Sequence, residues 1–237
     1  MLKNKYTGLW PAAEPMVKVD GVWRKASAAY IKVNGVFKKF YSETVGLESL
    51  VRWWDFNANL ADYVNNALAT LNDGAALGSA SGKNAVRVFG GRYVRVPGLS
   101  FSGDWTVSLW YYPLDFTSYA HLLTNETSQS NFALKLMAST GVPYLHTAGS
   151  GSVMAATGLT LNKWSMVTFT YTNGTLRIYI NGVLSVTQAA TITGPAGAYL
   201  IGKGHLTEYS NGYERDVMRW NRALTPTEVA ELYNIQK

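Results

Sequence analysis

The 237-residue chain contains no cysteine. Disulfide bonds, thiolate metal sites and a cysteine nucleophile are therefore excluded. No apolar run approaches the ~18 residues of a membrane span, so we expect no membrane segment. The first fifteen residues lack the apolar core of a secretion signal. We therefore expect the protein to be made in a cytoplasm and to stay there unless something else exports it.

Charged residues are also scarce, at 15% of the chain. Two explanations stay open: the chain buries extra surface against neighbours, as a homo-oligomer would, or its β surface is rich in uncharged polar residues. The formal charge of +6 belongs to residues 1–41, which hold eight Lys or Arg and two acidic residues. We therefore expect an acidic partner for this segment. The remainder is neutral, and we do not expect it to bind nucleic acid.

The chain is rich in alternating apolar and polar positions, most clearly in residues 163–187, which read KWSMVTFTYTNGTLRIYINGVLSVT. The period of two and the β-branched and aromatic side chains indicate strands. Asn173-Gly174 and Asn181-Gly182 separate them, and both residue types tolerate the positive φ of tight hairpin turns. The stretch predicts a three-stranded antiparallel meander.

This order of strands and turns resembles the central part of the laminin G-like, concanavalin A-like jelly-roll family. Three more pieces resemble that family in the right order: residues 101–113 (FSGDWTVSLWYYP), 199–204 (YLIGKG) and 216–233 (DVMRWNRALTPTEVAELY). The resemblance covers residues 47–237. It implies an all-β fold, a two-sheet antiparallel jelly-roll sandwich with a short C-terminal helix. It defines a fold better than a function, because jelly rolls include lectins, hydrolases and structural proteins.

Other local patterns fit the sandwich. Residues 50–56 predict its first strand, and residues 106–112 and 132–137 predict core strands. Residues 118–131 are polar and predict a loop. Residues 84–96 predict a hairpin that turns at its Gly-Gly pair.

The end of the chain predicts a docked helix of about ten residues. Thr225 is a good N-cap, Pro226 suits the first helical position, and Glu228 completes a capping box. Leu224 and Val229 are spaced to form a hydrophobic staple.

Residues 1–44 form a separate predicted unit, followed by the jelly-roll domain over residues 45–237. An extended arm comes first. Two similar hairpins follow at a spacing of 14, residues 18–25 (KVDGVWRK) and residues 32–39 (KVNGVFKK). Two hairpins make only a small sheet, so the unit needs support from the sandwich or another subunit.

This doublet resembles a short module near one end of phage virion proteins, particularly tail and particle-surface components. The resemblance implies that the segment anchors the chain to other virion proteins of the capsid or tail. A generic pair of basic hairpins is the alternative. The predicted anchoring residues are Trp10, Lys18, Trp23, Arg24, Lys25, Lys32, Phe37, Lys38 and Lys39.

The jelly-roll resemblance also implies a possible calcium site. The family often holds this ion in a loop after the first strand, where Asp62, Asn65 and Asn66 offer the oxygen ligands that calcium prefers. In the resembling family Asp216 marks a structural or ion-linked position. Tyr63-Val64 replace the small residues usual in the loop, and an ordinary Asx-rich loop is the alternative.

A glycan site on such a fold would use exposed aromatic rings, which stack on sugars, with polar side chains nearby. One loop carries Glu208, Tyr209, Asn211 and Tyr213, and another carries Tyr119 with Asn125. The alternative is that these tyrosines only edge the core.

Hydrolysis has less support. Jelly-roll glycanases set carboxylates on alternate residues of one strand, and Glu214 and Asp216 are the similar pair here, with Arg219 where a further acid is expected. Glycoside hydrolysis requires two carboxylates in defined opposition. The histidines are not paired at metal-ligand spacing, and no Gly-x-Ser-x-Gly elbow occurs. We predict no catalytic residues and no enzyme.

The sequence thus predicts a non-enzymatic phage virion protein. Its N-terminal segment anchors it to the particle, and its lectin-like jelly roll is displayed as a decoration or adhesin. Its expected location is the virion. A carbohydrate-binding module, recognising a host-surface glycan, is the second hypothesis, and a glycanase is the third.

Overall fold

The computed structural model describes residues 16–19, 22–25, 28–33, 36–42, 45, 49–127, 132–147, 151–192, 194–204 and 208–237. Up to residue 44 only the backbone is described. The strands are β1 (Met16–Val19), β2 (Val22–Lys25), β3 (Ala28–Val33), β4 (Val36–Ser42), β5 (Leu50–Trp54), β6 (Thr70–Asn72), β7 (Ala76–Ala80), β8 (Lys83–Val88), β9 (Tyr93–Phe101), β10 (Trp105–Pro113), β11 (Ala120–Asn125), β12 (Ala133–Leu136), β13 (Pro143–Thr147), β14 (Gly151–Met154), β15 (Ser165–Thr172), β16 (Thr175–Ile180), β17 (Val183–Ala189), β18 (Gly194–Ile201) and β19 (Gly212–Trp220). Helix α1 is Pro226–Gln236.

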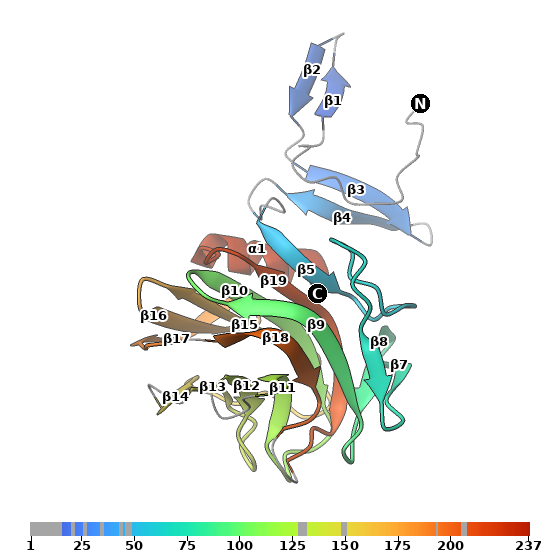
Figure 1. Cartoon of the computed structure of the whole chain (residues 1–237). Coiled ribbons are helices and arrows are strands. Elements are labelled where there is room, and N and C mark those ends of the chain that lie inside the picture. The colour runs from blue at the N-terminus through green and yellow to red at the C-terminus, as the bar shows by residue number, and fades with distance from the viewer. Residues whose placement is uncertain are drawn as a thin grey trace.

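Two antiparallel sheets pack face to face as a jelly-roll sandwich (Figure 1). The first has the order β17-β16-β15-β10-β19-β8-β7, and β5 also pairs with β19. The second has the order β14-β13-β12-β11-β18-β9-β6. The two hairpins β1–β2 and β3–β4 form small sheets of their own beyond β5 in Figure 1. The all-β sandwich predicted from the sequence is confirmed.

The predicted meander is present as β15, β16 and β17. Both Asn-Gly pairs between its strands have positive φ, 47° and 71° at Asn173-Gly174 and 52° and 80° at Asn181-Gly182. These are the signs that a type I′ turn requires, and its twist matches that of the flanking strands. The meander therefore follows from local sequence alone.

The core between the sheets is centred on aromatic rings. Phe101 stacks on Phe132 at 4.2 Å between centroids, and Trp105 meets Phe101 edge to face at 5.2 Å. Tyr199 closes the group at 5.1 Å from Phe101. All four are fully buried. Each such side chain contributes about 1.5–3 kcal/mol through its burial, so this group joins the two sheets firmly.

Helix α1 covers the outer face of the first sheet. Thr225 accepts a hydrogen bond from the Glu228 amide, and the Glu228 carboxylate accepts one from the Thr225 amide. This is the predicted capping box. Leu224 and Val229 are both buried in the cluster beneath the helix, where Trp220 also lies. The predicted helix and its N-terminal signals are confirmed.

Two local predictions are wrong. Strands β8 and β9 do not form a hairpin: β8 lies between β7 and β19 in the first sheet, whereas β9 lies between β6 and β18 in the second. Gly90 and Gly91 turn the chain from one sheet to the other. Residues 118–131 also include β11, which lies inside the second sheet and is buried throughout. The polar side chains of β11 can be buried because other side chains form hydrogen bonds with them.

Candidate functional site

Five side chains meet on the outer face of the second sheet. His121 pairs with Lys135 across β11 and β12, and Lys135 pairs with Tyr144 across β12 and β13. Their chain neighbours Leu134 and Leu145 belong to the core, so this row points away from it. Glu208 reaches the row from the segment before β19, and Tyr119 stands just before β11. We call Tyr119, His121, Lys135, Tyr144 and Glu208 the sheet-face cluster.

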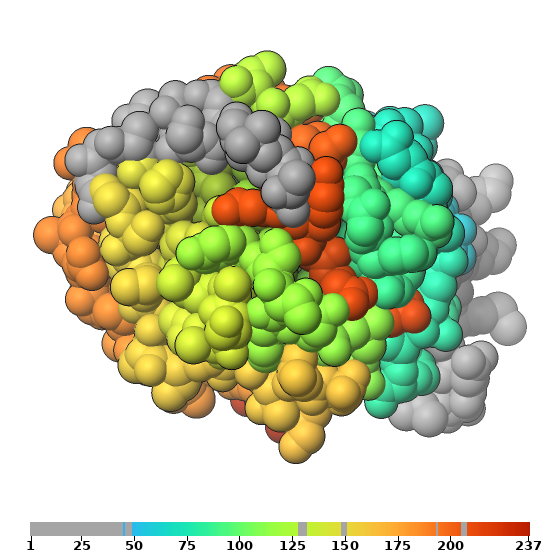
Figure 2. Space-filling model, turned by 90° about the horizontal axis from the view of Figure 1, so that it is seen from below, coloured from blue at the N-terminus to red at the C-terminus, as the bar shows by residue number. Residues whose placement is uncertain are grey.

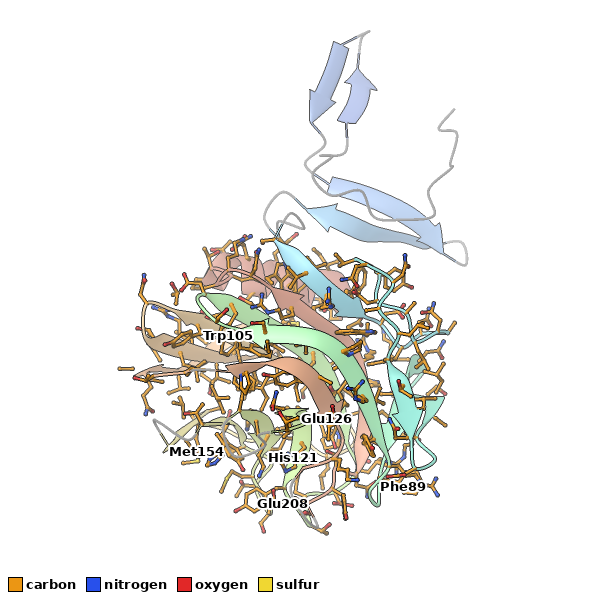
Figure 3. All side chains as sticks on the ribbon, in the orientation of Figure 1. Phe89, Trp105, His121, Glu126, Met154 and Glu208 are labelled. Atoms are coloured by element: carbon orange, nitrogen blue, oxygen red, sulfur yellow. The ribbon has the colours of Figure 1, made fainter. Side chains whose placement is uncertain are left out.

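Glu208 is the centre of this cluster. Its Oε2 lies 2.6 Å from Nζ of Lys135 and 2.8 Å from Nε2 of His121. Figure 3 shows His121 and Glu208 close together at the lower end of the sandwich. Nζ of Lys135 also lies 4.6 Å from the centroid of the Tyr119 ring and 5.8 Å from that of Tyr144. The result is a carboxylate and a cation beside two aromatic rings, which themselves meet edge to face at 6.3 Å.

The charges of the cluster are set by burial and hydrogen bonds. The bond from His121 and the ammonium of Lys135 hold the pKa of Glu208 at about 2, so it is ionised at neutral pH. Burial lowers the pKa of His121, which keeps the imidazole neutral. Its Nε2 then donates to Glu208, and its Nδ1 accepts from the Thr124 hydroxyl at 2.7 Å. The neutral imidazole therefore orients the carboxylate without adding charge.

Backbone packing holds the cluster in place. Gly202 donates to the His121 carbonyl, and Ser210 both accepts from the His121 amide at 2.8 Å and donates to its carbonyl. A Cβ added at Gly204 would lie 1.9 Å from the His121 ring. Figure 2 shows the orange-red chain around β18 and β19 crossing the lower face between the yellow-green and green strands. The segment that carries Glu208 is thus fixed against β11.

One part of the cluster is open. The Glu208 side chain is 33% exposed, and its Oε1 has no hydrogen-bond partner in the described part of the chain. Tyr119 is half-buried. Among the described residues, the cluster therefore presents an acceptor oxygen without a partner and part of an aromatic ring, both near the Lys135 ammonium.

The predicted glycan residues do not all meet. Tyr119 and Glu208 come together in the sheet-face cluster. The Tyr209 ring packs near Gly91 at the turn between β8 and β9. The Asn211 amide donates to Asp115, and its carbonyl accepts from Arg87 at 2.7 Å. These contacts commit the Asn211 side chain to the fold.

Tyr213 and Asn125 lie elsewhere. The Tyr213 ring lies 5.1 Å from the Arg87 guanidinium and meets Tyr112 edge to face. Asn125 is buried, and its carbonyl accepts from Thr127. Sequence reasoning missed His121, Lys135 and Tyr144. The alternation of apolar residues with Lys135 and Tyr144 marks one polar face, but nothing local reveals what covers it.

The predicted calcium ligands are arranged around Trp53. Oδ1 of Asp62 accepts from the backbone amides of Trp53 and Val64, and its Oδ2 lies 3.7 Å from Nε of Arg52. Asp216 accepts from the Trp53 indole and pairs with Arg215. The Asn65 side chain caps the Ala67 amide in its own loop. Both carboxylates already face a guanidinium, so this arrangement does not fit a calcium ion, and calcium stays a prediction to test.

Glu214 and Asp216 do not share a cleft. Glu214 pairs across the sheet with Tyr111 and Val86, which belong to the inter-sheet core, and it is fully buried there. Asp216 has a φ of 51°, so the strand is irregular between the two carboxylates. The opposition that glycoside hydrolysis needs is not formed by this pair.

The predicted anchoring residues cannot be placed. Trp10 lies outside the described residues, and for the other eight only the backbone of β1 to β4 is described. Within the described ranges, no group of three or more His, Cys, Asp or Glu could hold a metal ion. In the same ranges, no helix is long and apolar enough to cross a membrane.

Comparisons with known proteins agree with this fold. Domain 4 of AbnA, a GH43 extracellular arabinanase from Geobacillus stearothermophilus, solved in complex with arabinotriose, superposes with a TM-score of 0.66 at 20% identity, covering 78% of this chain and 98% of that one. The botulinum neurotoxin serotype D ligand binding domain in complex with N-acetylneuraminic acid superposes with a TM-score of 0.62 at 18% identity, covering 79% of this chain and 51% of that one.

A third similar structure comes from a study of botulinum neurotoxin type C, whose cell entry depends on interaction with two ganglioside molecules. It gives a TM-score of 0.65 at 16% identity, covering 80% of this chain and 52% of that one. The chain thus spans about half the length of these neurotoxin structures. No curated protein matches it in sequence. The profile of the concanavalin A-like lectin/glucanases superfamily matches residues 89–230, more than half of the sequence, and the chain belongs to that superfamily.

Proposed function

We propose that the chain is a non-enzymatic glycan-binding protein and that the sheet-face cluster is its binding site. The observation that carries the proposal is Oε1 of the ionised Glu208, which has no partner among the described residues, together with the Tyr119 ring on the same Lys135 ammonium. Sugars are bound by an apolar ring face together with acceptors for their hydroxyl groups, and a preoriented site reduces the entropy lost on binding. His121 and Lys135 hold the carboxylate in one orientation.

Two further facts support this assignment. The similar structures include domains solved with arabinotriose or with N-acetylneuraminic acid. The burial of Glu214 in the core argues against catalysis by the carboxylate pair of β19. A calcium requirement would be an addition to this site rather than part of it, since none of the five cluster residues belongs to the predicted ligand set.

Binding to an array of bacterial and host polysaccharides, followed by titration of each positive glycan, tests the proposal. Glu208→Gln and Tyr119→Ala should each weaken binding about tenfold or more, because each removes one of the two contacts. Tyr213→Ala is the matched control on the opposite sheet and also tests the other predicted loop. Loss of binding in Tyr213→Ala alone would move the site to that loop, and full binding by Glu208→Gln would reject the cluster.

A second function is favoured by the charge of the first segment. We propose that residues 1–44 anchor the protein to an acidic surface of a phage particle, capsid or tail, from which the jelly roll is displayed, and that the chain self-associates there. Opposite charge favours docking and orientation, while apolar burial supplies much of the affinity. The eight basic residues against two acidic ones in residues 1–41 carry this proposal.

Co-sedimentation of the full chain and of residues 45–237 with purified particles tests it. Residue 45 is the natural start, since Val45 is buried against the cluster under α1. Only the full chain should bind particles, and a thermal melt should show that the fragment is folded. A folded fragment that still binds particles would contradict the anchor. Sedimentation velocity of both proteins measures self-association.

A further inference from the structure

A pocket of about 310 Å³ opens beside β5. Figure 1 shows β5 at the upper end of the sandwich, whereas β11, β12 and β13 of the sheet-face cluster lie at its lower end. Two arginines lie side by side in it: Arg52 of β5 is the cross-strand partner of Arg219 of β19. The end of β9 forms the opposite wall. We call this the arginine pocket, and its lining residues are Val51, Arg52, Gly98, Leu99, Ser100, Ser102, Arg219 and Asn221.

Each guanidinium donates one hydrogen bond to the backbone of β9, and Nη1 of Arg52 also donates to the Val51 carbonyl at 2.8 Å. Nη2 of Arg52 donates to the Gly98 carbonyl at 3.0 Å, and Nη2 of Arg219 donates to the Ser100 carbonyl at 2.6 Å. Gly98 has a φ of 66°, and a Cβ there would lie 2.7 Å from Nη2 of Arg52. The glycine thus leaves the space that lets this guanidinium lie against the backbone.

Arg219 has no counter-charge among the described residues. It is only 6% exposed, and no carboxylate among the described residues forms an ion pair with it. Its Nε is buried with no hydrogen-bond partner in that part of the chain, and so is Nε of Arg52. Burial and the neighbouring Arg52 lower the pKa of Arg219 to about 10, which still leaves it charged at neutral pH.

The other buried arginine of β19 has a carboxylate partner. Arg215 pairs with Asp216, as Arg222 beyond the strand pairs with Glu228. An uncompensated buried cation is costly, so proteins normally pair it. In the described part of the chain, the one carboxylate that pairs with Arg52 is Asp62, whose Oδ2 lies 3.7 Å from Nε. Among the described residues, two adjacent cations with one carboxylate leave a net positive charge inside a pocket of ligand size.

We propose that the arginine pocket binds a small oxyanion: the carboxylate of an acidic sugar, or a sulfate or phosphate group. Guanidinium groups present paired donors that match these anions. Ser100, Ser102 and Asn221 add hydroxyl and amide donors at the rim. The site is distinct from the proposed glycan site, and it stands whether or not the sheet-face cluster binds a sugar.

Calorimetric titration of the full-length protein with sodium sulfate, sodium phosphate and sodium glucuronate tests the proposal. Sodium chloride at matched ionic strength and neutral glucose are the controls. Saturable binding of at least one oxyanion, with a matching rise in melting temperature, is expected. Equal binding of sulfate and glucuronate would mean that the pocket recognises the anionic group alone, whereas tighter binding of glucuronate would identify an acidic sugar.

Variants locate the site. Arg219→Gln should weaken oxyanion binding about tenfold or more, while Arg177→Gln, an arginine of β16 that lines no part of the pocket, should not change it. Ser102→Asp places a carboxylate at the exposed rim and should abolish binding while raising the melting temperature, so the test survives if Arg219→Gln fails to fold. Absence of oxyanion binding beyond the chloride control, or unchanged binding in Ser102→Asp, would overturn the proposal.

Discussion

Oε2 of Glu208 lies 2.8 Å from Nε2 of His121, although 87 residues separate them in the chain. Glu208 comes from the segment before β19, and His121 is the second residue of the buried strand β11. The contact therefore connects the last third of the sequence to the second sheet, and it makes Glu208 a structural as well as a candidate binding residue.

The first prediction concerns acid stability. Because the pKa of Glu208 is lowered to about 2, its stabilising effect is complete above its ordinary pKa near 4.5 and is lost as the pH falls toward 2. Glu208→Gln should therefore show a smaller loss of unfolding free energy than wild type between pH 4.5 and 2. Glu126→Gln, which removes an exposed ion pair with Arg95, is the control. Urea unfolding across this range measures the free energy of unfolding. An identical dependence of that free energy on pH in wild type and Glu208→Gln would contradict the prediction.

Gly204 provides a test of the packing. Its substitution by alanine would place a Cβ 1.9 Å from the His121 ring. We expect a loss of stability of about 1–3 kcal/mol, as for other overpacked sites, and weaker glycan binding because His121 must move. Gly78→Ala is a suitable comparison, since its Cβ would meet Tyr213 at an ordinary 3.6 Å. Equal melting temperatures for the two variants would show that the segment adapts freely.

Local sequence predicts those parts of the fold that local chemistry determines. The Asn-Gly turns required positive φ, and Thr225 with Glu228 defined the start of α1. Local sequence does not determine which strands pair with one another. Both β8 and β9 alternate correctly, yet β8 pairs with β7 and β19 whereas β9 pairs with β6 and β18, so the hairpin predicted between them was wrong.

The candidate site shows the same limit. The sequence predicts Tyr119 and Glu208 as glycan-binding residues of two separate loops, and the structure brings them together through Lys135. His121 could not be found, because a polar run around it indicated a loop. Only tertiary contacts with Glu208 and Ser210 make a buried histidine acceptable in that strand.

Calcium is the third subject for test. Asp62 and Asp216 both face guanidinium groups, and Oδ1 of Asp62 already accepts two backbone hydrogen bonds. We therefore expect the same melting temperature in calcium and in EDTA, and unchanged glycan binding. Calorimetry in both buffers is sufficient. A higher melting temperature in calcium that Asp62→Asn removes would instead establish the site implied by the family resemblance.

The last prediction uses Glu214, whose two carboxyl oxygens are buried without a hydrogen-bond partner in the described chain. Burial between the sheets disfavours the charged carboxylate and raises the pKa of Glu214 well above 4.5. The corresponding stability is complete below the unfolded pKa and is lost as the pH rises through the folded one. Above about pH 4.5 the wild type should therefore lose up to about 1.4 kcal/mol per pH unit relative to Glu214→Gln, which has no proton to release.

Unfolding of both proteins between pH 5 and 9 measures this difference, and a constant difference across that range would refute it. The same variant separates binding from hydrolysis. If Glu214 serves only as a neutral core residue, Glu214→Gln binds glycans as well as wild type does, and neither protein releases sugar from polysaccharide. If the chain were a glycanase using the β19 carboxylates, wild type would release reducing sugar and Glu214→Gln would not. Because Glu214 lies between the sheets, away from Glu208 and Tyr119, we expect the first result.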